Sequence, residues 1–135
     1  MYSEKMKKEP PSIDAWLKEA KSQPEASLEG MFLVHNGVVR QTPKAKVREG
    51  VDDVSTIKGM AFNYDAAKVE AVIAETYKMK GIFHVRVWLN HGQLELGDDI
   101  MYVLIGGDIR PNVVDALEFL VGKIKNECVT ENEQK

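Results

Sequence analysis

The chain is poor in the residues that bind metals or form disulfides. It has one cysteine, Cys128, which cannot form an internal disulfide and fits a reducing, cytoplasmic setting. Its three histidines, His35, His84 and His91, are scattered, and no cysteine or second histidine stands at zinc-ligand spacing from any of them. No Walker or dinucleotide-binding glycine pattern occurs either. We therefore expect no metal site, no bound cofactor and no Cys–His catalysis.

Long apolar runs and a basic excess are also missing. No apolar stretch reaches the ~18 residues that span a membrane. The first residues, MYSEKMKKEPPS, carry charges with no apolar run behind them, so no signal peptide is expected. The net charge of −3 and the pI of about 5.6 disfavour a general nucleic-acid binder. Neither membranes nor nucleic acids are expected partners.

What is present indicates one soluble globular domain. The 135 residues, 44% hydrophobic and 29% charged, can form one real core. Residues 1–10 are polar and end at a Pro-Pro pair, which predicts a disordered lead-in. We place the domain at 11–126. The remaining residues, 127–135, have no apolar stripe and are expected to form a fraying polar tail.

The strongest pattern is a strand followed by a helix near the C-terminus. Residues 100–105 form an apolar run typical of a short strand that is buried on both faces. Gly106-Gly107-Asp108 is expected to turn the chain, and Pro111 suits the first turn of a helix. That helix is predicted by one apolar stripe: Val113, Val114, Leu117, Leu120, Val121 and Ile124.

The other predicted elements follow from similar patterns. Asn36-Gly37 is either a tight hairpin turn or a glycine bulge in a continuing strand. Asp65 is a good N-cap, and Gly81 is the expected glycine after a helix end. We expect helices over 13–22 and 66–79, and strands over 30–34, 55–64, 82–89 and 93–96. This order predicts an α+β, two-layer fold with a mostly antiparallel sheet and helices on one face.

Three cations stand at element ends: Arg40, Arg110 and Lys125. A helix N-terminus approached through glycines can bind an anion, although an ordinary strand–turn–helix joint fits Gly106–Arg110 as well. Arg110 and Lys125 are separated by about 22 Å of helix, at about 1.5 Å per residue. If both serve one small anionic ligand, they come from two chains of a dimer. The loop over 41–50 adds positive charge, and is either a solvated loop or a cover for an anionic ligand.

Three blocks together resemble the large, catalytic subunit of molybdopterin synthase. The blocks are Gly30 with Asn36–Arg40, then Gly92–Asp98, then Arg110–Phe119 running to Ile124-Lys125. The resemblance implies an α+β fold with a hammerhead-like subdomain and a homodimer. It also implies a ubiquitin-like small subunit whose C-terminal Gly-Gly thiocarboxylate supplies sulfur to cyclic pyranopterin monophosphate. Matched residue by residue, it makes Lys125 the catalytic lysine and puts Arg40 and Arg110 in the substrate pocket.

The chain also departs from that family pattern. The family usually has a His-Arg pair where this chain has Leu89-Asn90. It usually has a histidine where this chain has Ile109. The family's Pro-x-Trp-Lys-x-Glu segment aligns with residues 129–134 of this chain. Here Glu131 replaces the tryptophan and Asn132 replaces the second lysine. An amide cannot supply a cationic ammonium. Three functions stay open. The first is a molybdopterin synthase-like sulfur transferase, and the second is a non-catalytic relative that binds a pterin, another anion or a protein. The third is a structural dimer module without a small ligand.

Overall fold

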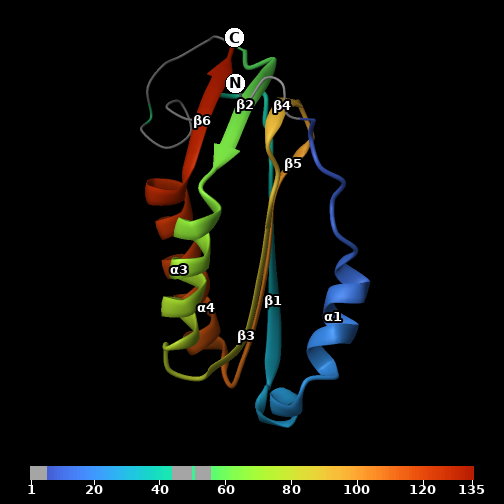
Figure 1. Cartoon of the computed structure of the whole chain (residues 1–135), viewed down its shortest axis with the longest axis vertical. Coiled ribbons are helices and arrows are strands. Elements are labelled where there is room, and N and C mark those ends of the chain that lie inside the picture. Colours follow the sequence, from blue (N-terminus) through green and yellow to red (C-terminus); the bar gives the residue numbers. More distant parts are fainter. Residues whose placement is uncertain (1–5, 44–49, 51–55) are drawn as a thin grey trace.

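The computed structural model describes residues 6–43, 50 and 56–135, and the statements below concern these residues. The chain folds into helices packed against two separate three-stranded antiparallel sheets (Figure 1). The elements in order are α1 (Ile13–Lys21), the 3₁₀ helix η2 (Pro24–Leu28), β1 (Met31–Val38), β2 (Gly59–Tyr64), α3 (Ala66–Tyr77), β3 (Ile82–Leu89), β4 (Gly92–Glu95), β5 (Asp99–Gly107), α4 (Arg110–Lys123), the π turn η3 (Ile124–Cys128) and β6 (Val129–Gln134). The predicted α+β class is confirmed.

The first sheet has the order β1-β5-β3, with the most apolar strand in its centre. Leu104 of β5 lies opposite Val34 of β1 and Arg86 of β3. Because successive side chains of a strand point to opposite faces, β5 sends apolar residues both ways. Met101, Val103 and Ile105 enter the main core, whereas Leu104 enters a second cluster. The expectation of a strand buried on both faces is confirmed.

The helices lie on both faces of this sheet, not on one as the sequence predicted. Figure 1 shows α1 on one side of β1, β5 and β3, and α3 with α4 on the other. Trp16 and Ala20 of α1 pack on Leu104, while Val113 and Leu120 of α4 belong to the main core. The physical reason is β5 itself, since a strand with apolar side chains on both faces needs cover on both.

The second sheet, β4-β2-β6, corrects the expectation for the C-terminal tail. Residues 129–134 do not fray but form β6, which pairs antiparallel with the whole length of β2. Val129 lies opposite Tyr64, and Gln134 lies opposite Gly59. Backbone pairing holds this strand although its sequence has no apolar stripe, because ladder hydrogen bonds do not depend on side-chain type.

Local signals along the chain were predicted well. Ser12 and Asp65 cap α1 and α3 by accepting hydrogen bonds from Ala15 N–H and Lys68 N–H. Gly81 has a positive φ of 74° after α3. The register shift between Gly37 and Val38 selects the bulge over the hairpin turn.

The described residues of the N-terminal lead-in contact the folded domain. Residues 6–10 form neither helix nor strand, yet the Lys8 ammonium donates to the Tyr64 hydroxyl at 3.0 Å and lies 5.3 Å from the Trp88 ring centre. Lys7 pairs with Asp98 at 2.9 Å. The expectation of disorder therefore does not hold for Lys7 and Lys8, whereas residues 1–5 lie outside the described residues. The predicted loop over 41–50 lies mostly outside them too. None of the helices described is long and apolar enough to cross a membrane.

Candidate functional site

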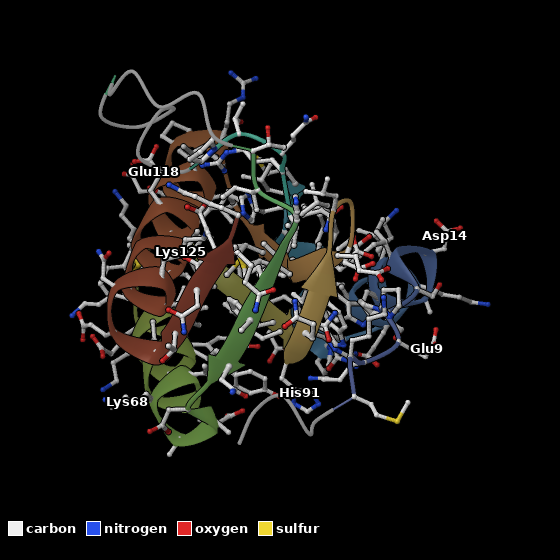
Figure 2. The ribbon with its side chains drawn as sticks, turned by 90° about the horizontal axis from the view of Figure 1, so that it is seen from above. Glu9, Asp14, Lys68, His91, Glu118 and Lys125 are labelled. Carbon is white, nitrogen blue, oxygen red and sulfur yellow. The ribbon has the colours of Figure 1, made fainter. Side chains whose placement is uncertain are left out.

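A pocket of about 260 Å³ lies where β1, β5, the end of α4 and β6 meet. Figure 2 shows Lys125 at this end of α4, beside the β6 strand. The pocket is lined partly by charged or titratable residues and partly by apolar ones. Its charged or titratable lining residues are His35, Arg40, Lys125, Glu131 and Glu133, and its other lining residues are Gly37, Val38, Met60, Ile100, Met101 and Val121.

Arg40 lines the pocket because the backbone just before it is fixed by a bulge and by hydrogen bonds. The bulge after Gly37 redirects β1, and Val39 is buried there. Val39 N–H donates to the Asp98 carbonyl at 3.0 Å, and the Val39 carbonyl accepts from Gly97 N–H at 2.9 Å. Arg40 itself is exposed, and no described residue bonds its guanidinium. Its planar fork is therefore available for a phosphate or carboxylate.

Lys125 also lines this pocket. Ile124, which precedes it, is fully buried and anchors the π turn at the end of α4. The Lys125 ammonium lies 3.6 Å from the Glu131 carboxylate, and the two side chains are 23% and 11% exposed. The pocket thus holds a cation in a partly buried ion pair.

Glu131 comes from β6, the segment for which the sequence predicts a fraying tail. Along β6 the side chains alternate, with Glu131 and Glu133 half-buried and Asn132 exposed. Asn132, opposite Ala61 of β2, does not line the pocket, although the resemblance puts a lysine at this position. Strand alternation applied to 129–134 would have predicted Glu131 and Glu133 on one face.

His35 is a second pocket residue that was not predicted from the sequence as part of a site. It lies opposite Val103 in the β1–β5 pairing, so its side chain shares the face of the main core. Burial and, second, the positive charge of Lys125 lower the pKa of His35 from its ordinary value. The electrostatic coupling and the shared pocket together place His35 and Lys125 in one site.

Arg110 lies at the other end of the molecule. It is the first residue of α4, is exposed, and does not line the pocket. α4 spans 14 residues, about 21 Å at about 1.5 Å per residue, between Arg110 and the π turn. Within one chain, Arg40 and Lys125 therefore share a pocket and Arg110 does not.

The expected glycine turn before α4 proves to be strand. Gly106 and Gly107 are the last two residues of β5 and pair on both sides, Gly107 with Met31 and Ile82. The Asp108 carboxylate accepts hydrogen bonds from Asn112 and from Ile109 N–H, and both lower its pKa. An acidic side chain at the start of α4 opposes anion binding there.

Cys128 is buried and takes no part in the pocket. Burial, above all, raises the pKa of its thiol, which disfavours the nucleophilic thiolate. Within the described ranges, no three side chains of His, Cys, Asp or Glu gather to hold a metal ion.

Comparisons with known proteins agree with this fold. Residues 6–127 match the family described as MoaE protein. A search of curated proteins found no match. Among solved structures, molybdopterin synthase from Staphylococcus aureus is 16% identical with a TM-score of 0.70, covering 93% of this chain and 85% of that one.

Two further solved structures share the fold. The molybdopterin biosynthesis MoaE protein from Burkholderia ambifaria is 17% identical with a TM-score of 0.68, covering 93% of this chain and 84% of that one. A chain in the complex of subunits 1 and 2 of molybdopterin-converting factor from Helicobacter pylori is 19% identical with a TM-score of 0.64, covering 90% and 74%.

The α+β fold, the two antiparallel sheets and the family match define a large-subunit-like protein of molybdenum cofactor biosynthesis. The chain belongs to the MoaE family. The resemblance found in the three sequence blocks is thereby confirmed.

Proposed function

We propose that this protein converts cyclic pyranopterin monophosphate to molybdopterin, with sulfur from the thiocarboxylate of a small subunit. The observation that carries the proposal is the pocket in which Arg40 and Lys125 face one cavity. An arginine fork suits a phosphate, and a nearby ammonium neutralises charge that develops when a thiocarboxylate attacks. Arg40 therefore holds the phosphate, and Lys125 assists the sulfur transfer.

The partners follow from the same site. The chain in the Helicobacter pylori complex, which shares this fold, is paired with a second subunit of its converting factor. That pairing supports a ubiquitin-like small subunit ending in Gly-Gly as the sulfur donor here. Arg110 is too far along α4 to reach its own pocket, so we assign it to the pocket of a partner chain in a homodimer. We propose that this reaction takes place in the cytoplasm.

The test is reconstitution with a thiocarboxylated small subunit and the pterin precursor. The wild-type chain is expected to form the dithiolene product, and Lys125→Ala is expected to lose at least about 100-fold in rate. Lys123→Ala is the matched control, because Lys123 lies two residues away but pairs with Glu127 outside the pocket. No dithiolene from the wild-type chain would refute the proposal.

A second function is favoured by one observation. Glu131 pairs with Lys125 in the pocket, and Asn132 stands where the family pattern has a second lysine, so the chain has less positive charge here than that pattern implies. A non-catalytic relative would bind a pterin or another anion without transferring sulfur. Binding of a pterin phosphate to the wild-type chain, with no product and with affinity unchanged in Lys125→Ala, would favour this alternative.

A further inference from the structure

The proposed function leaves His35 without a role, although it lines the same pocket as Arg40 and Lys125. Alternation along β1 aims His35 into the molecule on the side covered by α4, where Val121 and Lys125 also line the pocket. Its Nε2 lies 3.9 Å from the point that a Cβ atom on Gly37 would occupy. The ring therefore extends along the pocket wall over a residue that has no side chain.

Lys125 is held in an ion pair at this site. Its ammonium is 3.6 Å from the Glu131 carboxylate, in a pair of which the acid is only 11% exposed. A protonated lysine has three donors and no acceptor. Held in this way, Lys125 contributes a positive charge at a constant position.

His35 has the complementary property. Its pKa is lowered, first by burial and second by the charge of Lys125, which favours the neutral form of the ring. A neutral imidazole has one nitrogen that accepts a proton. Among the described residues no hydrogen bond or ion pair occupies the ring, so this nitrogen is available to a ligand. The other charged groups that face the pocket are Arg40, Glu131 and Glu133.

We propose that His35 is the proton acceptor of this pocket, while Lys125, paired with Glu131, acts as a fixed cation. The thiocarboxylate sulfur forms a C–S bond as a C–O bond of the pterin precursor breaks. The ring accepts a proton from an O–H or N–H group of the bound reactants, gives it to the departing oxygen and so ends neutral. For its substrate this inference rests on the proposed function. The ionisation of the ring is a property of the protein alone.

The first test is an NMR titration of the three histidine rings, assigned with single His→Gln variants. We expect the measured pKa of His35 to lie below 6.5 and to rise in Lys125→Met, because the neighbouring positive charge is removed. Lys123→Met, which leaves the pocket unchanged, is expected to leave that pKa where it is. A His35 pKa that does not respond to Lys125→Met overturns the inference.

The second test uses turnover. His35→Gln is expected to lower kcat about 100-fold with KM within about twofold, and to abolish the acidic limb of the pH profile. Added imidazole is expected to restore activity to His35→Ala, which a structural role would not allow. His91→Gln, outside the pocket, is the control. An acidic limb that persists in His35→Gln overturns the inference. If the wild-type chain forms no product, the proposed function fails and the titration alone decides the role of His35.

Discussion

The Lys125 ammonium lies 3.6 Å from the Glu131 carboxylate, so one acid on β6 neutralises the cation in the π turn that follows α4. This pair limits the positive charge that the pocket can offer to an anion.

Glu131→Gln tests that limit. Removing one negative charge from a partly enclosed pocket is expected to tighten binding of a pterin phosphate by about three- to tenfold at low salt, and less at high salt. Titration calorimetry at two ionic strengths measures the effect. Glu127→Gln is the control, since Glu127 pairs with exposed Lys123 and does not line the pocket. Equal affinities for Glu131→Gln and the wild-type chain would show that the pair does not control the ligand.

The end of β5 requires glycine for packing. A Cβ atom on Gly107 would lie 2.5 Å from the Gly81 carbonyl oxygen and 2.7 Å from Val113 Cγ2. Gly107→Ala is therefore expected to lower the free energy of unfolding by about 2 kcal/mol. Gly122, within α4, has open space around it, so Gly122→Ala is expected to raise that free energy by about 1 kcal/mol. Urea unfolding measures both, and a neutral Gly107→Ala would contradict the packing role.

Glu29 is half-buried, and its two carboxylate oxygens are buried with no hydrogen-bond partner among the described residues. Burial and, second, the charge of Glu25 raise its pKa above the ordinary value of 4.5. The folded state then binds a proton more readily than the unfolded state, so the wild-type chain gains stability as the pH falls through this raised pKa toward 4.5.

Glu29→Gln is expected to stabilise the fold by about 1 kcal/mol at neutral pH, because no charge is buried without a partner. The advantage is expected to shrink as the pH falls toward 4.5. Thermal unfolding between pH 4 and pH 8 measures it, with exposed Glu118→Gln as the control. A constant difference at all pH values would show that ionisation of Glu29 is not the cause.

Much of the fold could be predicted from periodicity and capping residues. The stripe that ends at Ile124 and the caps Ser12 and Asp65 all mark observed helices. β6 could not be found this way, because Val129 is its only apolar residue and pairing with β2 holds the rest. The turn predicted at Gly106 and Gly107 was wrong. A glycine pair usually indicates a turn, and here the glycines are needed because neighbouring atoms leave no room for a Cβ atom, which the sequence does not reveal.

The candidate site was predicted only in part. Element ends suggested Arg40 and Lys125, and the structure brings both to one pocket. Helix length alone excluded Arg110 from the same chain's site, and the structure agrees. His35 and Glu131 were not selected, because their importance depends on the meeting of β1, α4 and β6, which are far apart in sequence.

The most direct test of this account mixes two inactive variants. Lys125→Ala chains lack the lysine that we propose as catalytic, and Arg110→Ala chains lack the arginine that we assign to the neighbouring pocket. In a mixed dimer one pocket has both residues intact and the other has neither. Random mixing makes half of the dimers mixed, so about a quarter of the wild-type sites should be restored.

The measurement is dithiolene formation by the unfolded and co-refolded mixture, with thiocarboxylated small subunit and pterin precursor in excess. We expect about a quarter of the wild-type rate from the mixture and almost none from either variant alone. A mixture as inactive as its components, beside an active wild-type chain refolded in the same way, would contradict a site shared between two chains.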